Sequence, residues 1–492
     1  MEARRVSDRT AAGTPGAIPP QYRRNIAEMR GNAGRRAHQR PAPGHSGGTM
    51  QTDHGKTLSR VALASVIGTT VEWYDFFLYG VIAGIVLNKL YFPTSDPLVS
   101  TLLAYTTFLV GFVARPLGGI VFGHFGDRVG RKSMLVVTLV IMGVATAAIG
   151  LVPTYAQIGI WAPILLLVLR ILQGIGLGGE WGGSVLMAFE YAPPEKRGFY
   201  ASLPQMGVSI GLCGASGLVA LLSQVLTEAQ FLAWGWRVAF GASVILIAIG
   251  LWIRLKLMET PEFQAVKDRG EAVKLPFATL MSDFGRQVLL GLGIRYIEGV
   301  FFNLFAVFAI GYLTQQLSLT RTDALIGVMA AALVMCFFIP FFGKLSDRLG
   351  RARTFFWGAV ICGCSVFPAF WLMSSQPVHV LAVWISIVIP FGVFYAIIYG
   401  PEAALFAELF EPHVRYTGIS FVYQFSGIFA SGLTPIIATI LLRVNGGQPW
   451  LVCAYVVFAA LVSAVCVARV GRSPNEFGMA AGVAGAKSGS AK

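Results

Sequence analysis

Apolar stretches of about 20 residues recur along the whole chain, and they constrain its fold more than any other feature. A stretch of that length spans the hydrocarbon core of a bilayer as a helix. The sequence holds about twelve of them. They lie near 61–88, 99–123, 134–153, 162–188, 199–223, 237–256, 287–313, 324–343, 355–374, 379–404, 417–442 and 450–469. Transmembrane barrels show short alternating segments instead. The sequence therefore predicts an all-α membrane protein with twelve transmembrane helices.

The composition supports this class. Of the 492 residues, 55% are hydrophobic and only 13% are charged, whereas a soluble protein carries about 25% charged residues. The six cysteines fall in apolar stretches, and no histidine stands near them as a second metal ligand. They are interpreted as small packing residues, and the sequence predicts no metal site and no cofactor.

The positive charge of the chain, +14 overall, gathers in one tail and on alternate loops. Residues 1–49 hold nine arginines and three acidic residues, a net charge of +6. The loops near 126–132, 196–197, 254–286 and 344–353 are also basic, and the loops between them hold few charges. This alternation follows the positive-inside rule, so we expect both termini in the cytoplasm and no nucleic-acid partner. The first apolar stretch is too long and begins too late for a cleavable signal.

The chain divides into two similar halves. GHFGDRVGRK (Gly123–Lys132) recurs as GKLSDRLGRA (Gly343–Ala352), each after the second apolar stretch of its half. Repeated six-helix halves with a central site between them are typical of transporters. The predicted parts are a polar basic tail without a fixed fold at 1–57, six helices at 58–256, a cytoplasmic loop at 257–286, six helices at 287–470 and a cytoplasmic tail at 471–492. We expect 1–49 to be dispensable for transport.

Five further segments carry a resemblance to a known family. The repeated loop motif is similar to that of the major facilitator superfamily. The segments EWYDFFLYG, ARPLGGIVFGHFGDRVGRK, RILQGIGLGGEWGG, ETPEF and YGPEAALFAELFEPHVRYTGISFVYQ resemble the metabolite:H⁺ symporter family, and in it the shikimate-transporter-like branch. The match covers roughly 58–478. The resemblance implies a monomeric twelve-helix carrier in a bacterial inner membrane, which imports a small organic acid or zwitterion with protons.

The two loop motifs predict a latch, that is, contacts that hold the cytoplasmic face closed until the carrier opens there. Acid–base pairs and a helix-end interaction would form it. Positive-inside bias alone would explain the arginines, but not the Asp and Gly spacing that occurs twice. EYAPPEKRG and ELFEPHVRYTG add a Glu-to-Arg spacing of seven in each half. The candidate gating residues are Asp127, Arg128, Arg131, Glu190, Arg197, Asp347, Arg348, Arg351, Glu408 and Arg415.

The stretch 162–188 contains GIGLGGEWGG, which superficially matches a dinucleotide-binding loop. No strand precedes it and it lies in mid-membrane, so that interpretation fails, and close helix packing explains the glycines better. Arg170, Gln173 and Glu180 fall on one helical face of this stretch. Such a polar face is expected to line a cavity. A buried structural network between helices is an equal alternative for Glu180.

Other polar residues of the apolar stretches are further candidates for substrate binding. Arg115 precedes a proline, and Arg295 stands three residues before Glu298, so these last two could simply neutralise each other. Gln205 follows Pro204, where a broken helix would expose backbone to a ligand. Family analogy supports the remaining candidates loosely. They are Tyr79, Asn303, Tyr399 and Gln424.

Two acids, Glu72 and Asp75, stand at mid-depth in the first apolar stretch. Uncompensated charge there costs at least about 2.5–3.5 kcal/mol per residue. Each carboxyl group must therefore be neutral, paired with a cation or in contact with water. A group that carries a proton passes through all three environments during the transport cycle. No histidine lies at mid-membrane, so proton coupling falls to carboxyl groups. The sequence predicts Asp75 as the proton carrier, and for Glu72 either a transport role or a permanent salt bridge with an arginine of 162–188.

The predicted function is a proton-coupled symporter for a small organic acid such as shikimate, with protons, substrate and the lipid bilayer as its partners. The alternatives are carriers of α-ketoglutarate or citrate, carriers of betaine or proline, and a nutrient sensor built on a carrier scaffold. An enzyme is not expected, because no nucleophile–base constellation or metal cluster appears and the paired halves would go unexplained.

Overall fold

The computed structural model describes residues 47–94, 96–129, 131–178, 180–256, 276–411 and 414–471. The chain divides into two units, Met1–Lys56 and Thr57–Lys492. The described part of the first unit is the beginning of helix α2 (Gly47–Ile82). The arrangement of helices given in the following paragraphs is that of the second unit. Residues 1–46 of the predicted tail lie outside the described residues. Helix α2 begins at Gly47, whereas the division into two units falls between Lys56 and Thr57, next to the predicted boundary.

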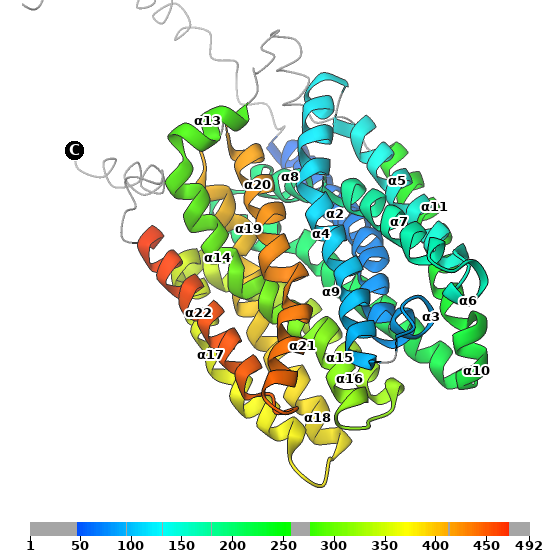
Figure 1. Ribbon diagram of the computed structural model, residues 1–492. Coiled ribbons are helices and arrows are strands. Elements are labelled where there is room, and N and C mark those ends of the chain that lie inside the picture. Colours follow the sequence, from blue (N-terminus) through cyan, green and yellow to red (C-terminus); the bar gives the residue numbers. More distant parts are fainter. Residues whose placement is uncertain are drawn as a thin grey trace, which may run out of the picture. The chain divides into compact units, whose positions relative to one another are not determined.

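The first half consists of six spanning segments, which Figure 1 colours from blue to green. These are α2 with the π-helical turn η1 (Ala83–Leu87) and α3 (Asn88–Leu90), α4 (Pro97–Val129), α5 (Arg131–Leu151), α7 (Trp161–Gly178) with α8 (Trp181–Glu190), α9 (Arg197–Val225), and α10 (Glu228–Gln230) with η3 (Phe231–Gly235) and α11 (Trp236–Lys256). Two short elements, α6 (Tyr155–Ile158) and η2 (Pro194–Lys196), lie in the connections.

The second half repeats this plan and continues from green to red in Figure 1. Its spans are α14 (Gly285–Asn303) with η4 (Leu304–Phe308) and α15 (Ala309–Gln315), α16 (Arg321–Leu349), α17 (Arg351–Ser374), α18 (Val380–Ile387) with η5 (Val388–Phe394) and α19 (Tyr395–Leu409), α20 (Arg415–Gly427) with η6 (Ile428–Gly432) and α21 (Thr434–Val444), and α22 (Trp450–Gly471). A short helix α13 (Pro276–Asp283) precedes them.

Eleven of these helices are long and apolar enough to cross a membrane, and the apolar part of the twelfth, α5, runs over Val136–Leu151. None of the described residues belongs to a strand, so the all-α prediction is confirmed for them. The predicted middle loop, 257–286, needs a correction. Residues 257–275 lie outside the described part, but 276–283 form helix α13 rather than loop.

The first spans of the two halves form the centre of the bundle. In the most apolar part of each, 94% of the residues are buried, against 28–56% in the other long spans. The outward side chains of those other spans include large apolar groups such as Ile245, Phe337 and Trp371, as lipid contact requires. A site between the halves is therefore walled by α2 and α14.

Close packing of α4 on α7 is confirmed as the role of the glycines near 174–178. A Cβ atom at Gly174 or Gly178 would collide with the carbonyl oxygen of Gly111 or Arg115 on α4. Gly118 on α4 meets the Ile175 carbonyl in the same way. Small residues of this kind let two membrane helices approach until their backbones touch. The first half thereby gains a tight helix pair next to the centre.

Candidate functional site

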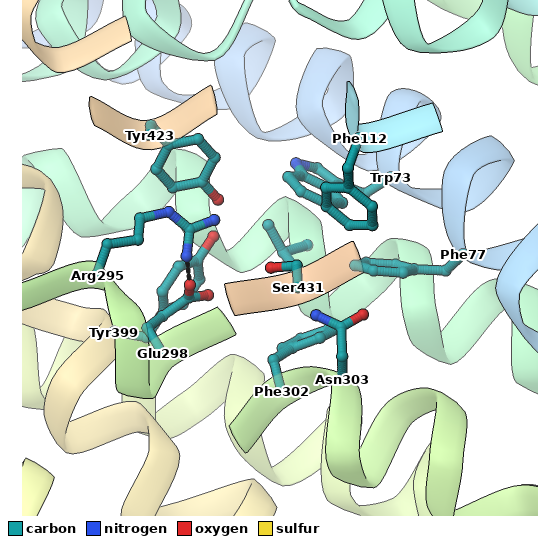
Figure 2. A pocket seen from close by; sticks show the side chains of 11 residues that line it. Trp73, Phe77, Phe112, Arg295, Glu298, Phe302, Asn303, Tyr399, Tyr423 and Ser431 are labelled. Atoms are coloured by element: carbon teal, nitrogen blue, oxygen red, sulfur yellow. Dashed lines mark ion pairs between the residues drawn. The ribbon is translucent and has the colours of Figure 1, made fainter. Parts of the chain in front are cut away.

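A small cavity lies between the halves, against α2 and α14 (Figure 2). Its wall is mostly aromatic and carries one ion pair. The lining residues are Trp73, Phe77, Phe112 and Val208 from the first half and Arg295, Glu298, Phe302, Asn303, Tyr399, Tyr423 and Ser431 from the second. The space open to the centre of a water molecule is about 10 Å³, roughly what one water molecule needs. A molecule larger than water can enter only after the halves move apart.

Contacts between the halves close the structure around this cavity. Two are stacked aromatic pairs, Phe77–Phe302 with ring centroids 4.9 Å apart and Trp181–Tyr423 with centroids 3.5 Å apart. Two are hydrogen bonds from a side-chain amide to a backbone carbonyl, Gln205 to Tyr399 at 2.6 Å and Gln424 to Gly178 at 3.2 Å. The predicted candidates Gln205 and Gln424 thus join the halves beside the cavity in this closed state.

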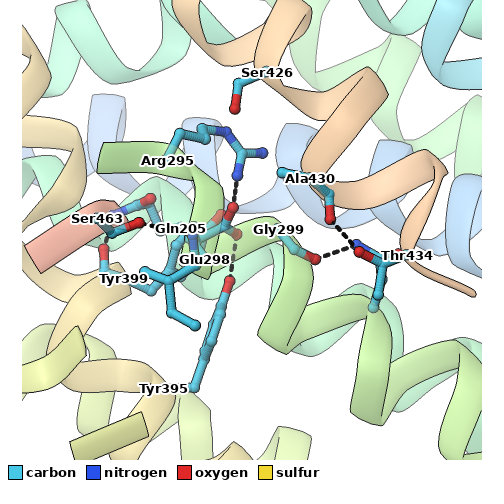
Figure 3. A network of polar contacts seen from close by, with 12 residues as sticks. Gln205, Arg295, Glu298, Gly299, Tyr395, Tyr399, Ser426, Ala430, Thr434 and Ser463 are labelled. Atoms are coloured by element: carbon cyan, nitrogen blue, oxygen red, sulfur yellow. Dashed lines mark hydrogen bonds and ion pairs between the residues drawn. The ribbon is translucent and has the colours of Figure 1, made fainter. Parts of the chain in front are cut away.

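A charged network on the second half reaches into the cavity. Arg295 and Glu298 form an ion pair one helical turn apart on α14, which confirms the pairing that their spacing predicts. The Tyr395 hydroxyl donates to Glu298 Oε1 over 2.6 Å, and the Arg295 guanidinium lies 3.7 Å from the Tyr423 ring centroid. Figure 3 shows Arg295 and Tyr395 pointing at Glu298 from two sides. Asn303, the next polar residue of α14, donates to the carbonyl of Gly299 over 2.9 Å.

Two arginines are buried in the first half without a carboxylate partner among the described residues. Arg115 stacks on cavity-lining Phe112, with its guanidinium carbon 4.2 Å from the ring centroid, and on Phe76 at 4.0 Å. Arg170 also stacks on Phe76, at 4.1 Å. The Nε and Nη2 atoms of both have no hydrogen-bond acceptor in the described part of the chain. Neutral π faces satisfy such cations only in part, so the two arginines can still receive an anion.

Gln173 links Arg170 to the first helix. Arg170 donates to the Gln173 side-chain oxygen, and Gln173 Nε2 donates to the Thr146 hydroxyl at 2.7 Å and to the Asp75 backbone carbonyl at 3.2 Å. The expected polar face of this helix therefore forms a network within the first half. Neither Arg170 nor Gln173 lines the cavity in this state. Nor does Glu180, which is buried, or Tyr79, whose hydroxyl bonds Thr107.

Asp75 is fully buried and faces away from the cavity. Trp73 and Phe77, two residues to either side on α2, line the cavity, whereas the hydroxyls of Thr146 and Ser243 lie beside the Asp75 carboxyl group. Neither carboxyl oxygen has a hydrogen bond of good geometry to a described residue. Glu72, one turn away, is also buried. The structure shows no ion pair from Asp75 to Arg115 or Arg170 in this state.

One end of the molecule is closed by the second copy of the loop motif. The carboxylate of Asp347 accepts hydrogen bonds from the backbone N–H groups of Gly198 (2.7 Å) and Phe199 (3.0 Å), in the first turn of α9. This joins the halves, because α16 belongs to the second and α9 to the first. Arg351 pairs with both Asp347 and Glu408. We call this end the latch face.

The other candidate gating residues differ in their contacts. Arg415 approaches Glu190 at 3.9 Å across the halves, and Arg197 stacks on the Phe189 ring at 4.8 Å. Arg348 is exposed. The side chains of Asp127, Arg128 and Arg131 lie outside the described part, so the first copy of the motif stays a prediction.

Asp347→Asn is expected to slow transport without weakening substrate binding. A carboxylate at a helix N-terminus contributes about 0.5–2 kcal/mol, so its loss shifts the balance between closed and open latch face by roughly 2- to 30-fold. Uptake rates and binding, measured on the same preparation, test this prediction. Asp323→Asn, which removes a half-buried carboxylate from the first turn of α16, is the control. A large loss of affinity with normal turnover would contradict a gating role.

The opposite end is closed as well. Arg321 pairs with Glu228 at 2.9 Å, and Arg443 pairs with Asp96 at 3.1 Å, both between the halves. The backbone N–H of Leu98, and then Arg443, hold the pKa of Asp96 below its usual range. This pair therefore persists as the pH falls, until the pH passes below the lowered pKa. With both ends closed, the structure is an occluded state.

One sequence prediction about the site is wrong, and several lining residues were not predicted. The break expected at Pro204 does not occur, because α9 runs without interruption from Arg197 to Val225. Neighbouring helices keep such a proline helical. The aromatic wall of Trp73, Phe77, Phe112 and Phe302 was missed, although the aromatic density of EWYDFFLYG was a usable signal. Val208 and Ser431 carry no signal in the sequence.

Twelve spanning helices in two similar halves, closed at both ends around a cavity with buried charges, define a transporter of the major facilitator fold. The family models "Sugar (and other) transporter" and "Major Facilitator Superfamily" match residues 61–286 and 297–482. The chain belongs to the major facilitator superfamily, in the metabolite:H⁺ symporter family with the shikimate transporter of Escherichia coli K12. The two are 40% identical over 82% of this chain and 93% of that transporter.

Other relatives agree with this placement, and a solved structure shares the fold. The inner membrane metabolite transport protein YhjE of Escherichia coli K12 is 42% identical over 77% of this chain and 87% of its own. The proline/betaine transporter of the same strain is 35% identical over 83% and 82%. The proton:xylose symporter XylE superposes with a TM-score of 0.67 at 16% identity, over 86% of this chain and 96% of that one. That likeness shows the fold.

Proposed function

We propose that the chain imports a small organic acid such as shikimate together with protons, by alternating access. The observation that carries the proposal is the pair of buried arginines, Arg115 and Arg170, which have no carboxylate partner among the described residues. Buried cations of this kind favour an anionic ligand, because its carboxylate would complete their charge and hydrogen bonds. The aromatic wall suits the apolar face of a small ring.

Charge balance would couple the substrate to a proton. The empty carrier is balanced when Asp75 is ionised and offsets the positive charge of Arg170, with Gln173 between them. The loaded carrier is balanced when Asp75 is protonated and the substrate carboxylate takes the arginine. Either half-loaded state leaves an unmatched buried charge, which is costly. The halves then rock about the cavity only when empty or fully loaded.

A betaine or proline carrier is the second candidate, since the proline/betaine transporter is a relative and an aromatic wall can recognise a quaternary ammonium group. Arg295 in the cavity wall and Arg115, which stacks on lining Phe112, argue against a cationic headgroup there. A bacterial inner membrane, cytoplasmic termini and a monomeric state belong to the same proposal, supported by the relatives and by the basic loops.

The proposal is tested with the purified protein in proteoliposomes. Labelled shikimate should accumulate when the outside is acidic, and a protonophore should abolish the accumulation. Unlabelled α-ketoglutarate, citrate, glycine betaine and proline serve as competitors. Proton-driven uptake of labelled glycine betaine or proline, with no uptake of shikimate, would select the second candidate. A substrate that shifts the melting temperature but never accumulates would indicate a sensor.

A further inference from the structure

Glu402 is a buried acid that the site described so far does not use. It lies on α19, three residues after cavity-lining Tyr399 and six before Glu408 of the latch face. Its side chain is fully buried, and neither carboxyl oxygen has a hydrogen-bond partner among the described residues. Tyr395, Tyr399 and Glu402 follow one another at helical spacings of four and three, so they share one face of α19. Glu402 therefore stands between the cavity and the latch face.

The charges around Glu402 do not balance if it is ionised. Among the described residues, Arg295 is the cation whose charge acts on Glu402, and Tyr395, Tyr399 and Tyr423 are the other titratable neighbours of Glu402. The charge of Arg115 acts on Arg295, Tyr399 and Tyr423 but not on Glu402. Arg295 is already paired with Glu298. One guanidinium thus faces two carboxyl groups in a dry interior, which leaves a negative charge unmatched unless one of the two is protonated. The ion pair with Arg295 and the hydrogen bond from Tyr395 stabilise the ionised form of Glu298. Glu402 is therefore the carboxyl group that is protonated.

We propose that Glu402 is a second proton-binding site of the carrier, which holds its proton while the latch face is closed and releases it to water when that face opens. The proposal rests on the proposed proton-coupled function and adds a proton to it. On release, the O–H bond of Glu402 breaks and the proton passes to water. Arg295 then moves from Glu298 to the new carboxylate, and Glu298 is left facing the water-filled cavity that it lines.

Opening of the latch face reaches Glu402 through its own helix. Gln205 on α9 donates to the carbonyl of Tyr399, one turn from Glu402, across the two halves. Glu408, at the end of α19, is held by Arg351, which also binds the latch residue Asp347. Separation of α9 from the second half breaks the contacts of Gln205 and Asp347 together, so water gains access to this face of α19.

Infrared difference spectroscopy of the full chain in lipid tests the protonation without any substrate. At neutral pH the C=O stretch of a protonated carboxylic acid should be present in the wild type, lost in Glu402→Gln and retained in Asp323→Asn. It should also be lost in Glu298→Gln, because Arg295 is then free to pair with an ionised Glu402. This variant decides the question even where Glu402→Gln does not fold. Equal bands in the wild type and Glu402→Gln, or a band that survives in Glu298→Gln, overturn the proposal.

The ratio of protons to shikimate moved by proteoliposomes tests the release. We expect the ratio of Glu402→Gln to be lower by one than that of the wild type, with Asp323→Asn unchanged. An unchanged ratio in Glu402→Gln overturns the proposal and leaves the carrier function intact. A wild type that moves no shikimate defeats the proposed substrate instead, and the infrared result still decides the state of Glu402.

Discussion

Arg115→Met should abolish substrate uptake and at the same time stabilise the protein. The Arg115 guanidinium is buried against aromatic rings without a carboxylate partner in the described part of the chain. Replacing buried ionic groups by apolar residues of similar size often stabilises by about 1–4 kcal/mol. Loss of the charge that meets the substrate carboxylate should cost about 2–5 kcal/mol of binding, roughly 30- to 5,000-fold in Kd. Melting temperature and shikimate uptake of the purified variant measure both effects.

Arg237→Met is the matched control, because Arg237 is an arginine with satisfied donors. Its Nη1 donates to the carbonyls of Gly150 at 2.6 Å and Val152 at 2.8 Å. Removing these bonds takes the Arg237 donor from the Gly150 carbonyl and leaves the Val152 carbonyl with the Tyr91 hydroxyl at 2.6 Å. This variant should therefore lower the melting temperature and leave substrate affinity unchanged. A lower melting temperature in Arg115→Met, with normal affinity, would show that Arg115 is structural and not a binding group.

Asp75→Asn should abolish uphill uptake but keep exchange of substrate across preloaded vesicles. Asparagine mimics the protonated acid permanently. The loaded carrier can still reorient, because the substrate carboxylate balances the charge of the arginine. The empty carrier cannot, because it has lost the Asp75 carboxylate that balances this charge. The complete burial of Asp75 makes such an imbalance expensive. Binding should also depend less on pH than in the parent protein.

Glu72→Gln is the control for Asp75→Asn, and it should damage folding or binding more than coupling. Loss of exchange together with uphill uptake in Asp75→Asn, at intact binding, would point to gating instead. If proton-driven accumulation survives in Asp75→Asn, the assignment fails and the proton belongs to another buried acid, such as Glu72, Glu180 or Glu298.

Most of the fold could be predicted because a bilayer forces each spanning segment to be long, apolar and helical. The positions that could not be predicted are those where packing decides. The π-helical turns η1 (Ala83–Leu87) and η4 (Leu304–Phe308) have the composition of an ordinary α-helix, so they cannot be predicted from their sequences. Helix α13 (Pro276–Asp283) forms at the end of the polar stretch 257–286, which the sequence predicts to be a loop.

The sequence indicated the buried charges but not the aromatic lining, and of the predicted charged residues Arg295 lies in the cavity wall whereas Arg170 and Asp75 do not. A charged residue in an apolar stretch is expensive and stands out, which is why Arg115, Arg170, Asp75 and the Arg295–Glu298 pair could be found from the sequence. The same rule applies to Glu402, an acid after Pro401 inside an apolar run, and it was overlooked. Aromatic walls such as Phe302 cannot be told from core packing, because the direction of a ring depends on how the helices assemble.

The closure of both ends has an electrical consequence. A membrane that stores energy as a proton gradient loses it through any continuous file of water, along which protons hop from molecule to molecule. In this structure the internal space has room for about one water molecule, and ion pairs and a capped helix end separate it from both faces. In this closed state the described residues leave no continuous file of water across the membrane. Under the proposed symport, protons cross the membrane only in a conformational cycle, so a cell can keep many copies of the carrier in its membrane without a leak current.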